Sequence, residues 1–147
     1  MNKFILNNVN SEVDCGILDF IKKIDNKEDV TFTTSGTTGE PKKIIHDYNT
    51  LTKNIKVKNE LKGTIWGLTY DYTKIAGSQV ILQSYLNDGK IVNLFKKLYS
   101  EIVHLVNEHN ITHISATPTF STYNFKFVVV YPFNYIFSVD PLIILLN

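Results

Sequence analysis

The chain has 147 residues, which is enough for one domain with a hydrophobic core but not for two domains of ordinary size. Its 15 Lys and Arg residues nearly balance 14 Asp and Glu residues, and a net charge of +1 gives no global field to hold nucleic acid or anionic lipid. The single cysteine, Cys15, excludes an internal disulfide and any multi-cysteine metal site, and it fits a cytoplasmic protein.

Residues 1–28 are expected to form a short strand or extended lead and then a helix. Apolar residues at three- to four-residue spacing predict one buried helix face, made by Val13, Ile17, Phe20, Ile21 and Ile24. Cys15 falls in this helix. Because nothing near it resembles an activating base, we expect a small buried residue rather than a nucleophile. The first ten residues lack the apolar core and cleavage site of a signal peptide.

The segment from Asp29 to His46 predicts a strand that leads into an anion-binding loop. Residues 30–33 are β-branched or aromatic, as in a strand. Gly36 and Gly39 allow positive φ and close backbone approach, so that successive N–H groups can converge on one phosphate. Short hydroxyls and one ammonium complete the candidate cofactor-binding set, which is Thr34, Ser35, Gly36, Thr37, Thr38, Gly39 and Lys42. An ordinary surface turn is the alternative, because Gly, Ser and Thr clusters are common in loops.

The nine residues from Thr34 to Lys42 resemble the phosphate-loop signature of the adenylate-forming (AMP-binding) superfamily. That superfamily includes acyl-CoA synthetases, aryl-CoA ligases and the adenylation domains of peptide synthetases. The strand before the loop and His46 after it are also similar to the family, whereas Lys43 stands where the family usually has Gly. The resemblance implies an α/β fold with a mainly parallel sheet and crossover helices, as a partial N-terminal subdomain of such an enzyme.

The same resemblance implies a two-step reaction for a complete relative. A carboxylate substrate attacks the α-phosphate of magnesium-bound ATP, which gives an acyl adenylate and pyrophosphate. The thiol of coenzyme A or of a carrier protein then displaces AMP. The loop would hold the leaving phosphates. ATP and Mg²⁺ are therefore the implied cofactors, while neither catalytic residues nor protein ligands to a metal are assigned in this chain.

Residues 47–93 predict a helix, a strand, a second helix and a second strand. Asp47, Asn49 or Thr50 can cap a first helix that ends near Gly63. Residues 64–69 read as a buried strand, which would form a parallel crossover unit with the strand before the loop. The second helix ends at residues 87–89 and carries Ile75, Gln79, Leu82 and Leu86, and residues 91–93 form a short strand.

Two tyrosines follow the strand at residues 64–69. In the family, the stretch after the corresponding strand usually carries an aromatic or His residue that borders the acyl-substrate pocket. Tyr70 and Tyr72 are candidates for that position. The alternative is a purely structural role, since partly buried tyrosines are common at strand ends.

Residues 94–120 predict a helix and a strand. An apolar stripe from Phe95 to about Asn107 includes Leu98, and residues 111–115 form the last convincing strand. His109 and His113 are four apart and would share a face on one helix, as two zinc ligands can. The β-branched residues between them favour a helix end followed by a strand instead, and no third ligand is evident.

The final stretch, residues 121–147, differs from the rest. It is rich in aromatic residues, has only Lys126 and Asp140 as charges and contains no glycine. Pro132 and Asn134 interrupt its charge-free run, which falls short of the roughly twenty apolar residues of a membrane span. Our hypothesis is a reading frame broken near Ser121, so that an unrelated apolar tail follows a truncated product.

These observations divide the chain into an N-terminal lead and helix (1–28), a partial AMP-binding domain (29–120) and an atypical apolar tail (121–147). The favoured function is a truncated AMP-dependent synthetase or ligase that is inactive alone. The alternatives are a non-catalytic module that binds ATP or pyrophosphate and an inert remnant that the aromatic tail makes prone to aggregation.

Overall fold

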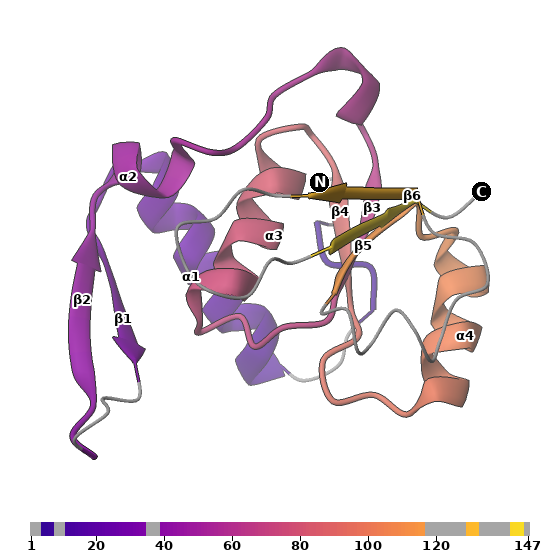
Figure 1. Ribbon diagram of the computed structural model, residues 1–147, viewed down its shortest axis with the longest axis horizontal. Coiled ribbons are helices and arrows are strands. Elements are labelled where there is room, and N and C mark those ends of the chain that lie inside the picture. The colour runs from indigo at the N-terminus through magenta and orange to yellow at the C-terminus, as the bar shows by residue number, and fades with distance from the viewer. Residues whose placement is uncertain (1–3, 8–10, 35–38, 117–128, 133–141, 146–147) are drawn as a thin grey trace.

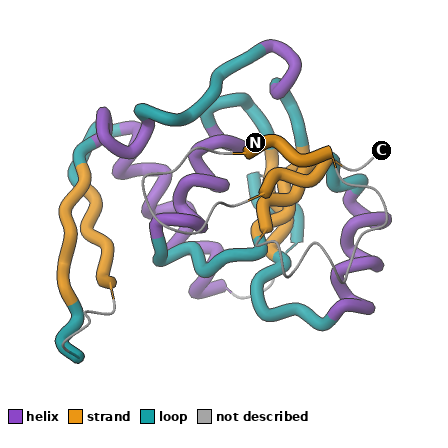
Figure 2. Tube along the Cα trace, in the orientation of Figure 1, coloured by secondary structure: helices purple, strands orange, loops and turns teal. Residues whose placement is uncertain are grey.

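A computed structural model describes residues 4–7, 11–34, 39–116, 129–132 and 142–145 of the chain (Figure 1). In chain order its elements are α1 (Ser11–Asp25), β1 (Val30–Thr34), β2 (Lys42–His46), α2 (Tyr48–Thr52), a single 3-10 turn (Asn59–Leu61), β3 (Ile65–Leu68), α3 (Ile75–Tyr85), β4 (Lys90–Asn93), α4 (Tyr99–His109), β5 (His113–Ala116), β6 (Val129–Pro132) and β7 (Leu142–Leu145). The strands form two separate sheets, one of five strands and one of two (Figure 2).

The five-stranded sheet has the order β4-β3-β5-β7-β6. β3 lies between β4 and β5 and runs parallel to both, with Gly67 opposite Val92 on one side and Ile114 on the other. The predicted α/β fold with parallel strands is therefore confirmed. The lead is also extended, because Ile5 forms a parallel bridge with Ile91 and the Leu6 amide donates to the Ile91 carbonyl at 2.9 Å.

The last two strands were not predicted. β7 pairs antiparallel with β5, in a register that sets Ala116 opposite Leu142, and β6 pairs antiparallel with β7. The expectation that residues 111–115 form the last strand is therefore wrong. Both added strands lie within residues 121–147, so this segment extends the sheet along the free edge of β5.

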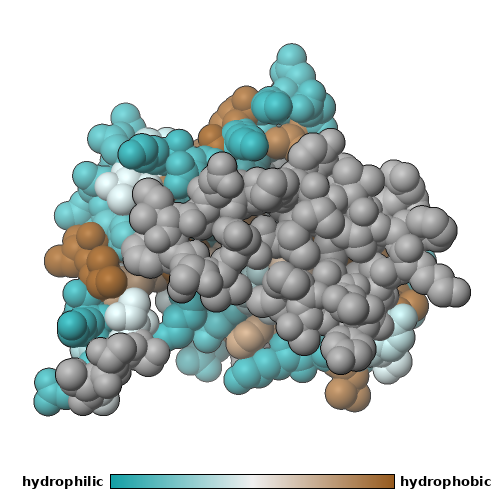
Figure 3. All heavy atoms as spheres, in the orientation of Figure 1, coloured by the Kyte–Doolittle hydropathy of each residue, from teal (hydrophilic) through white to brown (hydrophobic). Residues whose placement is uncertain are grey.

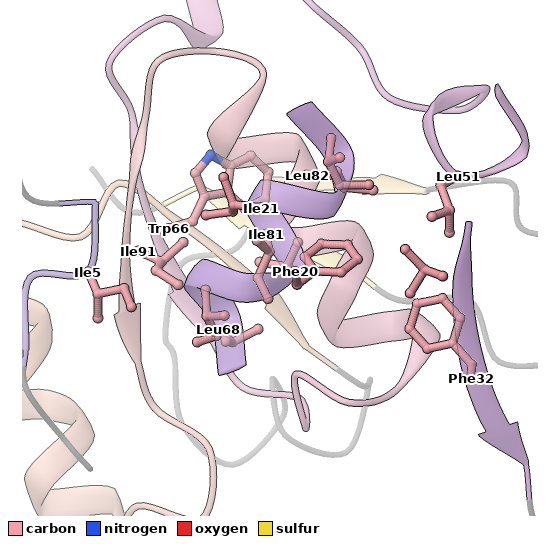
Figure 4. Close-up of a cluster of buried hydrophobic side chains, with 14 residues drawn as sticks. Ile5, Phe20, Ile21, Phe32, Leu51, Trp66, Leu68, Ile81, Leu82 and Ile91 are labelled. Carbon is pink, nitrogen blue, oxygen red and sulfur yellow. The ribbon is translucent and has the colours of Figure 1, made fainter. Parts of the chain in front are cut away.

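One face of the parallel strands packs against α1 and α3 (Figure 4). Trp66 is 1% exposed and lies in a cluster with Ile91 of β4, Ile81 of α3 and Ile17 of α1. The helical spacing predicted for α1 is confirmed, because Ile17, Phe20, Ile21 and Ile24 are all buried.

The other face of the strands packs against α4 through a second cluster that includes Val92, Leu94, Ile102 and Ile114. Gly67 makes this packing possible: a Cβ atom at that position would lie 2.7 Å from Leu94 Cδ1. β3 is thus covered on both sides, as expected for a central parallel strand.

The expectation that Cys15 is buried is wrong, because this cysteine is exposed. Position 15 lies two residues before Ile17, which is about 200° around a helix at 3.6 residues per turn. The thiol therefore leaves α1 on the side opposite the buried face.

The prediction that the helix after the hairpin extends to near Gly63 is wrong, since α2 ends at Thr52. Two buried side chains, Gln83 of α3 and Asn87 just after α3, bind the backbone that follows α2. Gln83 accepts from the Lys56 amide at 3.1 Å and donates to the Lys56 carbonyl at 2.7 Å, while Asn87 accepts from the Lys58 amide at 3.0 Å. These bonds occupy backbone groups that a longer helix would need for itself.

The predicted start of α4 is also wrong, because this helix begins at Tyr99 and not at Phe95. Before it, the Phe95 amide donates to Asn93 Oδ1 at 2.9 Å and Lys96 has a φ of 57°. Leu98 is the N-cap residue and is 71% exposed, and its amide donates to Glu101 Oε2 at 2.9 Å. Leu98 is therefore not part of the buried stripe.

Replacement of Gly77 by alanine is expected to destabilise the fold by about 3 kcal/mol. Alanine normally stabilises a helix more than glycine does. At position 77, however, a Cβ atom would overlap the Asp71 carbonyl oxygen and lie 2.9 Å from Tyr72 Cα. These are backbone atoms, which cannot rotate away as a side chain can. Urea denaturation of Gly77→Ala and Gly16→Ala provides the comparison. A Cβ atom at Gly16 meets only the outer ring atoms of Tyr72, which can rotate, so a larger loss in Gly16→Ala would contradict this account.

Stability is expected to fall on acidification partly through His113. Its ring stacks on Trp66 with centroids 4.8 Å apart, and burial lowers the pKa of His113 below its usual value. The unfolded chain then binds the proton more readily, so stability declines as the pH falls below about 6.5. In His113→Phe the unfolding free energy should depend less on pH between about 7.5 and 5.5. His104→Gln, at an exposed site, is the control; an unchanged slope in His113→Phe would refute this role.

Candidate functional site

The candidate loop connects β1 and β2, which pair antiparallel as a hairpin. This corrects the predicted crossover unit: β1 does not join the parallel sheet, and the loop leads into a strand instead of a helix. Thr34 lies opposite Lys42 at the base of the loop, and the Thr34 hydroxyl donates to the Lys42 carbonyl at 3.4 Å. Gly39 has a φ of +87°, a conformation that glycine allows. Ser35, Gly36, Thr37 and Thr38 lie outside the described residues.

The two faces of the hairpin differ in exposure. Directly paired residues share one face of an antiparallel ladder, so Phe32, Ile44, Thr34 and Lys42 lie on one side. Phe32 is 5% exposed on that side, whereas Ile45 on the opposite side is 66% exposed. Hydrophobic atoms over the upper part of β2 are visible at the left of Figure 3. The side chains of Lys42 and its neighbour Lys43 therefore leave the hairpin from opposite faces.

A groove of about 440 Å³ lies between the hairpin and the start of α3. Its lining is mainly apolar and consists of Phe32, Thr33, Thr34, Ile44, His46, Lys74 and Ile75. The ring of His46 packs edge-on against Phe32, with centroids 5.7 Å apart. His46 therefore has a packing role at the edge of the groove.

Lys74 is a feature of the groove that the sequence analysis missed. Its ammonium donates to the Thr33 carbonyl at 3.1 Å, one residue before the loop. The same residue is the N-cap of α3 and makes no side-chain cap hydrogen bond. The sequence did contain one signal for this residue, because a lysine stands at the helix N-cap, where Ser, Thr, Asp or Asn is preferred.

The chain leaves the hairpin through a capped helix, as predicted. The Thr50 amide donates to Asp47 Oδ1 at 2.7 Å, and this hydrogen bond holds the pKa of Asp47 below its usual value. Leu51, one turn into α2, is 1% exposed, so α2 connects β2 to the main core.

The two tyrosines proposed for a substrate pocket do not line this groove. The Tyr70 hydroxyl is buried, and this burial raises the pKa of Tyr70. The Tyr72 ring lies against Gly16 of α1. Neither observation tests a contact with substrate, and the assignment stays a prediction.

The histidine pair lies on two different elements. His109 is the last residue of α4 and His113 is the first residue of β5, as the β-branched residues between them predicted. Within the described ranges, no group of three or more His, Cys, Asp or Glu side chains is arranged to hold a metal ion.

The fold described here is similar to one part of a solved CoA synthetase, an enzyme of the class that the loop sequence predicted. The structure resembles o-succinylbenzoate-CoA synthetase (MenE) of Bacillus subtilis in complex with AMP, with 24% sequence identity and a TM-score of 0.50. MenE structures with ATP and magnesium and with the acyl-adenylate intermediate also match, each at 24% identity and a TM-score of 0.49, over 60% of this chain and 20% and 24% of theirs. No protein-family model and no curated protein matches the sequence.

The structural match covers 61% of this chain and 25% of the MenE chain, so the chain spans about a quarter of that enzyme. The predicted resemblance to adenylate-forming enzymes is thereby confirmed at the level of the fold. Among the residues that the structure describes, no helix is long and apolar enough to cross a membrane.

Proposed function

We propose that the chain is a partial AMP-dependent synthetase or ligase whose loop, from Thr34 to Lys42, binds the phosphates of ATP. The observation that supports this most is the coincidence of two independent features. The nine-residue loop has the phosphate-loop signature, and the fold that carries it matches that of MenE, a CoA synthetase. A surface turn of ordinary composition does not account for both.

The geometry of the hairpin suits this function. Thr34 and Lys42 face each other at the base of the loop, and Gly39 has the positive φ that lets consecutive amides turn toward one point. An anion held there would receive backbone N–H groups, hydroxyl groups and one ammonium group. Mg²⁺ would arrive with the triphosphate, because no protein metal ligands are assigned in this chain.

In this proposal the loop holds the leaving pyrophosphate while a carboxylate substrate attacks the α-phosphate. Groups that are already oriented toward the phosphates stabilise the charge that develops in such a transfer. A thiol, of coenzyme A or of a carrier protein, would accept the acyl group in the second step. A cytoplasmic location remains a prediction from the single cysteine.

We expect the 147-residue chain by itself to bind ATP without activating a carboxylate. Holding phosphates does not position the carboxylate, and positioning contributes several orders of magnitude to such reactions. Carboxylate-dependent exchange of pyrophosphate into ATP is the measurement, run beside ATP-dependent protection against thermal unfolding. Exchange above background would assign ligase activity to the chain; absence of both exchange and protection would contradict the binding function itself.

Lys42→Ala is expected to weaken ATP binding about tenfold, because a hydrogen bond to a charged group is lost at a partly solvated site. AMP binding should change less, since the ammonium is proposed to contact the leaving phosphates. Lys43→Ala is the matched control, with the same charge removed from the opposite face of the hairpin. Isothermal titration calorimetry of the wild type and the two variants with ATP and AMP measures this. Equal losses of ATP affinity in the two variants would contradict the proposed role of Lys42 in the phosphate site.

A further inference from the structure

Lys74 occupies a position that helix stability does not explain. The N-cap of a helix favours a short side chain that accepts a hydrogen bond, and the positive end of the helix dipole disfavours a cation. Lys74 satisfies neither preference and makes no side-chain cap hydrogen bond. The turn before α3 is held by other groups, because Asp71 Oδ1 accepts from the Thr73 amide at 2.9 Å and from its hydroxyl at 2.8 Å.

The ammonium of Lys74 instead reaches the hairpin. It donates to the Thr33 carbonyl at 3.1 Å, across 41 residues of sequence. Thr33 directly precedes Thr34, where the loop begins. Among the described residues, the hairpin shares no strand pairing with the five-stranded sheet, so side-chain contacts of this kind help to determine how the hairpin sits relative to the core.

The other end of this contact is fixed. α3 is buried along most of its length, including Val80, Ile81 and Leu82. Gly77 brings the first turn of α3 into close contact with the backbone at Asp71 and Tyr72. A hydrogen bond from the start of α3 therefore connects the base of the loop to a helix that is buried over most of its length.

We propose that Lys74 is a positioning residue that holds the base of the phosphate loop against α3. This inference rests on the proposed function of the loop. A loop whose base is already fixed loses less conformational entropy when it binds a phosphate chain, so the hydrogen bond raises affinity without touching the ligand. Lys74 acts on the ligand only through the loop.

The first test measures the hairpin without any nucleotide. Hydrogen–deuterium exchange of the amides in β1 and β2 is compared in the wild type, Lys74→Ala, Lys74→Arg and the control Lys62→Ala, whose ammonium pairs with Asp88 at 3.7 Å. Loss of one hydrogen bond should raise hairpin exchange about three- to tenfold in Lys74→Ala. Lys74→Arg retains a charged donor and should restore protection, while Lys62→Ala should match the wild type.

The second test measures ATP and pyrophosphate binding by calorimetry in the same four proteins. Lys74→Ala should weaken the binding of both ligands about three- to tenfold, and Lys74→Arg should restore the affinity. Weaker binding with unchanged exchange in the free protein would mean that Lys74 contacts the phosphates directly, and would overturn the positioning role. Faster exchange with unchanged affinity would overturn it as well.

The two tests separate this inference from the proposed function. If the wild type binds neither ATP nor pyrophosphate, the phosphate-binding function fails and the positioning role fails with it. The exchange measurement in that case still shows whether Lys74 fixes the hairpin. If the wild type binds both ligands and Lys74→Ala alters neither exchange nor affinity, only the positioning role is rejected.

Discussion

The fold depends on the burial of β3 on both of its faces. Trp66 fills one side beneath α1 and α3, and the absence of a side chain at Gly67 lets Leu94 and Ile114 close the other. Complete burial of a large apolar side chain is worth about 2–3 kcal/mol, so this strand contributes strongly to a domain of this size. Because α3 packs against the same strand, this packing also fixes the position of the start of α3.

The hairpin has a different physical character. It is joined to the core by the buried side chains of Val30 and Phe32, by Leu51 just after it and by the hydrogen bond from Lys74. In the part of the chain that the structure describes, no ladder hydrogen bonds connect the hairpin to the larger sheet. A loop at the end of this hairpin can approach a ligand from the edge of the domain, but the orientation of the hairpin then depends on a few side-chain contacts.

Much of the fold was predictable from hydrophobic periodicity. α1, α3 and the strands β3 and β4 each have apolar residues at the spacing of their own element, bounded by glycine or polar residues. β2 was missed because Ile44 and Ile45 are adjacent and show no alternation, so its pairing with β1 depends on where the loop brings it. The tail strands β6 and β7 were missed because their pairing with β5 is a tertiary property that composition does not encode.

The end of the helix after the hairpin was mispredicted because residues far apart in the sequence form hydrogen bonds there. Gln83 and Asn87 bind the backbone of residues 56 and 58, nearly thirty positions earlier, and these bonds end a helix that local sequence allows. Lys74 and Thr33 were missed as a pair for the same reason. The candidate loop residues could be proposed from the sequence because a phosphate site built from consecutive amides would be a local property of one short stretch, and their role stays a prediction.

The two lysines that follow the loop differ in their surroundings. Lys43, at a position where the family that the loop resembles usually has Gly, lies within β2 opposite Thr33, where any L-residue can adopt extended backbone. Its side chain is exposed, on the face that points away from Phe32 and the groove. Two adjacent lysines of equal charge are therefore not equivalent. Strand alternation directs Lys42 to the side of the hairpin that faces α3 and Lys74, and it directs Lys43 to the opposite side.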